Sequence, residues 1–345
     1  MSDHETGRSK EKIVYLEICR IIAVFCIMYQ HTGGRGADAW VYTESAWVYV
    51  TSLVGTIIGS IGVPLFWMVS GALLLPKKES WRKVYGKRIP RFTGVLIIFS
   101  VIRYFYLCIV EGCDGHAGEF FWRFYTQEIF LPYWFLYEYL GVLLVLPFLR
   151  KLIQNLTEQE KRLLFALMIG WNILNDISHT YLGVGFVLNL HFQSAISYFM
   201  LGYLMENCRM LRQRGKGGVR FDIGLAVFTM AVLYRWGCGQ HGLEELGSLT
   251  MLLTIAAYDL IRCVSEKSIW NNTVLHRLIL WCGSNVFGIY LIEDYLRNAT
   301  TFIWERSAPY IGAVPACCVW LLAVFLLGNV LVSGLRRLPV FNNML

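Results

Sequence analysis

The first apolar run of the chain carries ionisable side chains whose spacing suits acid–base chemistry. It covers residues 13–32, with Glu17 and Arg20 near its start and His31 near its end. A helix here would place Arg20 and His31 on one face, about three turns or ~16 Å apart. Imidazole changes charge near neutral pH, so His31 can accept a proton from a hydroxyl group. A lone histidine at a helix end is more often an interfacial side chain, but the embedded Arg20 on the same face favours catalysis.

Other apolar runs also carry charges. A charge within a membrane segment costs roughly 2.5–3.5 kcal/mol on insertion scales, so it usually faces a cavity or a partner. On the topology given below, Arg103, Glu138, Glu293 and Asp294 share the outer half of the membrane with His31. We expect them, with Trp134, to line a polar cavity that binds a hydrophilic acceptor. The alternative is a set of intramembrane ion pairs, such as Glu17–Arg20 or Arg103–Glu138, which a transporter would also contain.

The densest basic cluster is residues 77–91, with seven Lys and Arg residues. Arg88 and Arg91, spaced i and i+3, suit the phosphates of a nucleotide or of coenzyme A. The simpler interpretation is cytoplasmic positive charge with anionic-lipid contact. Ser70 and Gly71 lie near the depth of Arg20. Helix packing explains Gly71, whereas for Ser70 packing and donor binding both stay open.

Composition places the chain in a membrane. Of its 345 residues 56% are hydrophobic and 16% charged, with a mean hydropathy of +0.49, against about a quarter charged in soluble domains. The net charge of +7 does not indicate nucleic-acid binding, because most Lys and Arg form clusters that alternate with apolar runs, the positive-inside pattern. No Cys or His spacing typical of a metal site occurs, so no metal is expected. Cys113 and Cys238 fall in expected outer loops, and their pairing stays open.

The apolar runs predict an all-α, polytopic membrane protein of about ten transmembrane helices with no soluble domain. We expect a cytoplasmic tail at 1–12, a transmembrane domain at 13–335 and a second cytoplasmic tail at 336–345. Pro64 should kink the second helix. The expected helices cover about 13–32, 52–75, 92–110, 131–149, 163–175, 186–206, 221–236, 247–262, 278–296 and 311–334.

Several segments together resemble one family. RIIAVFCIMYQH is an Arg-x10-His first helix, VPLFWMVSGALLL has the Ser-Gly of a second, and RIPR is an Arg-x-x-Arg opening to a third. LPYWFLYEYLGVLLVLPFL resembles a Trp-Phe-Leu…Leu-Pro fourth helix, and FGIYLIE a late Ile-Tyr-Leu-x segment. Over residues 13–335 the chain resembles the acyltransferase 3 family of bacterial integral-membrane acyltransferases, which modify surface and secreted glycans.

The resemblance implies roles for named residues. His31 would be the essential histidine, Arg20 its partner, and Arg88 and Arg91 would lie at the acyl-CoA site, where Ser70 is also expected. Many relatives have a histidine after Ile-Tyr-Leu-x, whereas this chain has Glu293 followed by Asp294. That carboxylate would orient His31 or bind acceptor hydroxyls.

The expected activity is O-acyl transfer, of an acetyl group above all. The donor would be cytoplasmic acyl-CoA as co-substrate, with no bound cofactor, and the acceptor a surface glycan or its lipid-linked precursor. The location implied is the bacterial cytoplasmic membrane, with both termini cytoplasmic. A transporter or flippase for a glycan precursor is the alternative, weakened because only the second helix is plainly interrupted. A sensor-like module is a third, disfavoured by the intact Arg-x10-His. The acyl group, the acceptor, the choice between direct transfer and an acyl-enzyme, and the oligomeric state stay open.

Overall fold

The computed structural model describes residues 2–112, 115–127, 129–184, 192–212, 216–239, 242–265 and 273–342. These ranges consist of helices joined by turns and loops and contain no strand, which confirms the all-α fold class. The chain divides into two compact units. The first comprises Met1–Leu74 with Leu156–Gly334, and the second Leu75–Asn155 with Leu335–Leu345.

The first unit is organised around α1 (Ser2–Gln30), which packs most extensively against four other helices. The segment expected as the N-terminal tail, residues 1–12, is helical from Ser2 onward and continues into α1. The four helices most extensively packed against α1 are α3 (Ala46–Gly59), α4 (Gly62–Leu74), α13 (Gly247–Ser265) and α14 (Thr273–Ile311). The remaining helices of this unit are α2 (Ala39–Tyr42), α9 (Glu158–Leu182), α10 (Ala195–Asn207), α11 (Arg209–Arg212), α12 (Lys216–Gly237) and α15 (Ala313–Leu335).

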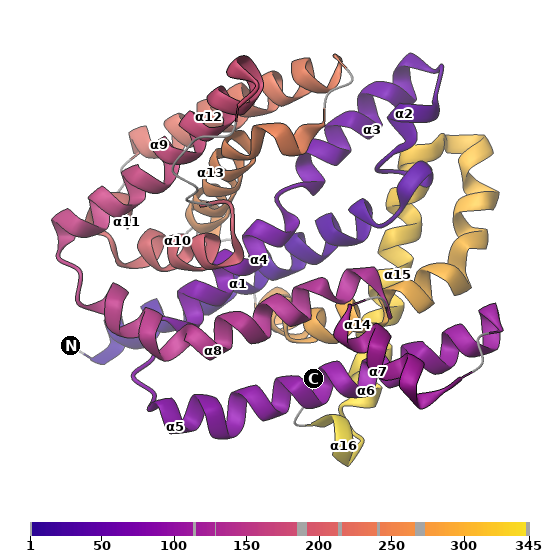
Figure 1. The fold of residues 1–345 in the computed structure, drawn as a ribbon. Coiled ribbons are helices and arrows are strands. Elements are labelled where there is room, and N and C mark those ends of the chain that lie inside the picture. The colour runs from indigo at the N-terminus through magenta and orange to yellow at the C-terminus, as the bar shows by residue number, and fades with distance from the viewer. Residues whose placement is uncertain are drawn as a thin grey trace. The chain divides into compact units, whose positions relative to one another are not determined.

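The expected second helix is divided into α3 and α4, which follow one another along the chain (Figure 1). The break lies at Ser60 and Ile61, four and three residues before Pro64, which is where the ring of a proline disturbs the preceding turn. Pro64 is in the first turn of α4. Amide groups there have no partner within the helix, so a residue that lacks an N–H costs no hydrogen bond.

Two glycines allow α4 and α10 to pack at very short distance. A Cβ built at Gly71 would overlap the backbone of Phe199, and one built at Gly202 would overlap the backbone of Met68. Small residues on facing helices allow this close approach in membrane proteins. Helix packing therefore explains Gly71, and it holds the neighbouring Ser70 in a buried position.

The second unit contains α6 and α8, which pack against each other. A π-helical turn, η2 (Val84–Arg88), leads directly into α6 (Ile89–Glu111). Between α6 and α8 (Trp134–Gln154) lies α7 (Ala117–Tyr125), within what was expected to be a loop. The other elements of the unit are α5 (Trp81–Lys83), the 3₁₀ turn η3 (Leu131–Tyr133) and α16 (Pro339–Asn342).

Six helical segments in the described ranges are long and apolar enough to cross a membrane. The multi-pass character of the chain is thereby supported, but the count of ten is not confirmed. The six segments are Ala46–Leu74, Trp81–Val110, Gly217–Gly237, Gly247–Ser265, Thr273–Ile311 and Ala313–Leu335.

The structure bears on the pairing of two cysteines. Cys238 is a free, exposed thiol, so it does not pair with Cys113, which lies outside the described residues. Cys108 is disulfide-bonded.

Candidate active site

His31 lies immediately beyond the end of α1, and neighbouring residues fix that end against α3. The side-chain amide of Gln30 donates to the carbonyl of Thr56 at 3.0 Å, and the hydroxyl of Tyr29 donates to the carbonyl of Ser52 at 3.4 Å. The backbone N–H of His31 still donates to Ile27, as in a continuing helix, at 3.1 Å. His31 therefore begins the turn from a firmly held helix end.

The imidazole of His31 contacts a carboxylate on α14. Its Nδ1 lies 2.7 Å from Oε1 of Glu293, whose side chain is 2% exposed. Because an ionised carboxylate only accepts hydrogen bonds, Nδ1 carries the proton, and in the neutral imidazole Nε2 then presents a lone pair. Within the described part of the chain Nε2 has no hydrogen-bond partner, and the His31 side chain is 24% exposed. This arrangement suits a general base oriented by a buried carboxylate.

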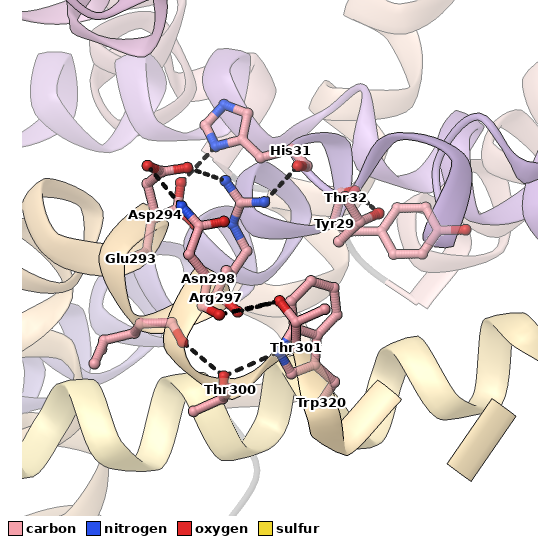
Figure 2. Close-up of polar contacts among 11 residues, drawn as sticks. Tyr29, His31, Thr32, Glu293, Asp294, Arg297, Asn298, Thr300, Thr301 and Trp320 are labelled. Atoms are coloured by element: carbon pink, nitrogen blue, oxygen red, sulfur yellow. Dashed lines mark hydrogen bonds and ion pairs between the residues drawn. The ribbon is translucent and has the colours of Figure 1, made fainter. Parts of the chain in front are cut away.

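Arg297, one turn beyond Glu293 on α14, holds this pair together (Figure 2). Its Nε donates to Oε2 of Glu293 at 2.5 Å, and its Nη1 donates to the backbone carbonyl of His31 at 2.6 Å. Its Nη2 donates to Oδ1 of Asp294 at 3.0 Å. The other oxygen of Asp294 accepts from Asn298 at 3.3 Å. One guanidinium therefore joins both acidic residues to the main chain of the histidine.

Arg20 lies at the other expected position on α1 and forms an ion pair. Its Nη1 is 3.1 Å from Oε1 of Glu17, so the predicted pairing within the helix is present. A Cβ at Gly283 of α14 would overlap the Glu17 side chain. Glu17 and His31 thus both contact α14. Glu17 lies against Gly283, and His31, just beyond the end of α1, contacts Glu293, further along α14. The two helices run in the same direction, and the face shared by Arg20 and His31 is turned towards α14.

A compact charge cluster in the second unit surrounds Glu79. Arg88 contacts both carboxylate oxygens, with Nε at 2.9 Å and Nη2 at 2.7 Å. Arg150, 4% exposed, adds Nη2 at 3.2 Å, and Lys83 adds Nζ at 3.3 Å. Hydrogen bonding from Arg88 is the main reason that the pKa of Glu79 falls to about 2. Burial, assisted by the charge of Arg88, lowers the pKa of Lys77. Several cations therefore share one carboxylate.

Arg91 has different surroundings from Arg88. It is exposed, and its charge, after burial, is a second cause that lowers the pKa of Arg336. Of the two arginines that were expected to act as a pair, Arg88 therefore binds the Glu79 carboxylate, whereas Arg91 is exposed.

The residues expected to bind the acceptor fall in both units. Glu293 and Asp294 belong to the first unit and are engaged with His31 and Arg297, as described above. Arg103, Glu138 and Trp134 belong to the second unit. Arg103 lies over the ring of Phe130, 4.1 Å from its centroid, and Glu138 and Trp134 are exposed on α8.

The sequence interpretation missed Arg297, Glu79 and Arg150. The signal for Arg297 was present, because it stands i+4 from Glu293 and i+3 from Asp294, spacings that bring side chains together on a helix. A buried network that joins the middle of α1 to the C-terminal parts of α10 and α13 was also missed. There Glu206 accepts from Tyr15 and Tyr258, and Arg262 binds Asp259 and two backbone carbonyls.

No group of three or more potential metal ligands of the His, Cys, Asp or Glu type gathers in the described ranges. A family model described as an acyltransferase domain matches residues 13–332. No curated protein and no solved structure is matched by this chain.

Proposed function

Because the chain belongs to this acyltransferase family, we propose that it moves an acyl group, specifically acetyl, from acyl-CoA to a hydroxyl group. The acceptor would be a cell-surface glycan or its lipid-linked precursor. The protein would act in the bacterial cytoplasmic membrane, with both termini in the cytoplasm. No bound cofactor takes part, because the thioester of the co-substrate already supplies an activated acyl group.

The observation that carries this proposal is the contact between His31 and Glu293. With Nδ1 engaged by Glu293 at 2.7 Å, the lone pair on Nε2 is directed away from the carboxylate. A histidine held in this tautomer can take a proton from an acceptor hydroxyl. The position where relatives often have a second histidine would then serve to orient the base.

The transfer needs only groups that the donor, the acceptor and His31 supply. Nε2 takes the hydroxyl proton as the oxygen attacks the thioester carbonyl carbon, forming a C–O bond. Collapse of the tetrahedral intermediate breaks the C–S bond and releases the thiolate of CoA. The proton on His31 then passes to that thiolate, so the enzyme returns to its starting state. The same residues permit a route through an acyl-histidine, in which Nε2 itself attacks first.

The donor would be held through its phosphates by Arg88 and Arg91, with Ser70 near the thioester end and Arg20 helping to position it. Arg88 is bound by Glu79 on one edge. Its outer Nη1 and the exposed Arg91 are the groups that would meet phosphate oxygens. Replacement of either arginine should therefore raise the KM for acyl-CoA more than it lowers kcat.

The acceptor would be recognised by Trp134, Arg103, Glu138 and Asp294, whose hydrogen-bonding groups and aromatic surface suit a sugar. Glu293, first expected among them, is better suited to orienting His31. The transporter alternative draws support from ion pairs within the helices, such as Glu17–Arg20 and Glu293–Arg297, but the family match favours acyl transfer over it.

The test is release of free CoA from acetyl-CoA by purified protein, with and without glycan acceptor. His31→Ala should lower kcat by about 10²–10⁴-fold, the usual contribution of general-base catalysis. His179→Ala, which removes an exposed histidine of α9, is the matched control. Wild-type activity in His31→Ala would contradict the assignment. Mass spectrometry of surface glycans with and without the gene should reveal one missing acyl mass and so identify both acyl group and acceptor.

A further inference from the structure

We propose that Arg297 is a positioning residue for acyl transfer, which holds His31 and Glu293 in the geometry that general-base catalysis requires. The inference rests on the proposed function, since it assigns a role within the same site. It concerns a residue for which neither the motifs nor the family match provides a role.

The argument begins with what Arg297 touches. Nε binds Oε2 of Glu293 at 2.5 Å, while the other oxygen of Glu293 binds Nδ1 of His31. Nη1 binds the backbone carbonyl of His31 at 2.6 Å. Both members of the 2.7 Å contact are thus attached to one rigid, planar group. Rotation of the Glu293 side chain, or withdrawal of the end of α1, would break a bond to Arg297.

Charge and burial support the same role. Glu293 is 1% exposed and Arg297 is 9% exposed, so neither ion is stabilised well by water. Without a cation, buried Glu293 would lie beside a second carboxylate, Asp294, one residue away. Removing one partner of a buried ion pair leaves an uncompensated charge, which the structure relieves by moving. The loss of Arg297 should therefore displace Glu293 before it disturbs the remainder of α14.

Lysine cannot reproduce this arrangement. The guanidinium uses three nitrogens in fixed directions, one for each of Glu293, His31 and Asp294. An ammonium has the charge but not the planar fork. Arg297→Lys should keep the carboxylates neutralised and the protein folded while losing at least one of the three contacts, which makes it the variant that separates charge from geometry.

The first experiment measures acetyl transfer by Arg297→Met, Arg297→Lys, Arg297→Ala and the unaltered protein. We expect kcat to fall about 10²-fold in Arg297→Met, the usual effect of displacing a reacting group by about 1 Å. The KM for acetyl-CoA should remain within about twofold, since Arg297 has no assigned contact with the donor. The kcat of Arg297→Lys should lie between those of Arg297→Met and the unaltered protein. Added guanidinium at tens of millimolar should restore part of the kcat of Arg297→Ala, an effect that a merely structural role would not produce.

The second experiment reads the histidine directly and needs no activity. In protein labelled with ¹⁵N-histidine, the hydrogen-bonded Nδ1 resonance of His31, identified by its absence in His31→Gln, should be lost in Arg297→Met. Arg306→Met, which removes an exposed arginine of the same helix, is the control and should retain it. An unchanged resonance in Arg297→Met would overturn the inference whether or not acetyl transfer is found. So would wild-type kcat in that variant, or a failure of guanidinium to restore any activity to folded Arg297→Ala. Lack of transfer by the unaltered protein, with the resonance lost as expected, would instead refute the proposed function.

Discussion

At the scale of single residues, Glu293 does two things that a histidine at the same position could not do together. Its two oxygens accept from different partners, one from His31 and the other from Arg297. A neutral imidazole has only one acceptor nitrogen. The carboxylate therefore connects a base to a buried cation, and Glu293, Asp294 and Arg297 act as one set.

Replacing Glu293 with glutamine should therefore be costly although the shape is almost preserved. The amide group can present an N–H to Nδ1, which favours the tautomer with its proton on Nε2 and removes the base. We expect kcat to fall about 10²-fold or more with little change in the KM for acetyl-CoA. Steady-state kinetics of purified protein will measure this, with Glu305→Gln, an exposed acid on the same helix, as control. Equal losses in both variants would show that the contact with His31 is not responsible.

Glu79 gives the second unit a pH-dependent stability. Its pKa lies at about 2 in the folded protein, against an ordinary value of 4.5. The sign follows from linkage: the folded state favours the ionised form, so this contribution is complete above pH 4.5 and is lost as the pH falls towards 2.

At pH 7, Glu79→Gln should destabilise the protein by about 2 kcal/mol, because Arg88 and Arg150 lose their shared counter-ion. As the pH falls from about 4.5 to 2, the unfolding midpoints of the variant and the unaltered protein should converge, since protonated Glu79 resembles glutamine. Thermal unfolding in detergent measures this, with Glu44→Gln, an exposed acid, as control. A difference that stays constant down to pH 2 would contradict the role of Glu79.

At the scale of elements, the sequence predicted which segments are helical much better than where they end. Hydropathy reports the apolar stretch that matches a bilayer, whereas a helix continues until something stops it. The expected helix at 278–296 runs from Thr273 to Ile311 and ends before Gly312, whose φ is +86°. Arg297 was missed for this reason, because it was assigned to a loop one residue beyond the expected end. His31 and Glu293 could each be selected by residue type, but their contact depends on how α1 packs against α14, which no local pattern contains.

The packing of α4 against α10 can be tested by adding a single methyl group. Gly71→Ala would place its Cβ against the backbone of Phe199, which cannot move without shifting α10. We expect a loss of about 1–3 kcal/mol, typical of overpacking. Gly170→Ala is the matched control, because a Cβ in the middle of α9 meets nothing within 4 Å. It should be neutral or stabilising by up to about 1 kcal/mol, since alanine favours helix. A thermal unfolding midpoint lowered equally in both variants would contradict this explanation.

At the scale of the whole molecule, the direction of the helices links the site to the membrane. In a chain that crosses a membrane back and forth, all odd-numbered spans run in the same direction. The helices α1 and α14, which correspond to the first and the ninth of the ten expected spans, do run in the same direction. His31, just beyond the end of α1, therefore meets its carboxylate in the middle of α14. If both termini are cytoplasmic, as proposed, the basic clusters after the even-numbered spans would lie on the cytoplasmic side, where acyl-CoA would bind, and His31 would lie towards the opposite surface.

This topology makes a prediction that depends on Cys238, the free and exposed thiol just beyond α12. If α12 runs outward, Cys238 lies outside, and a membrane-impermeant maleimide should label it in intact spheroplasts. Gln159→Cys, an exposed position near the start of α9, should be labelled only after the membrane is permeabilised, because it lies between basic residues on the cytoplasmic side. Labelling is measured by mass spectrometry, with Cys238→Ser as the blank. The reverse pattern would place the His31 end of α1 in the cytoplasm, on the same side as acyl-CoA, and an acceptor on the cell surface would then be out of its reach.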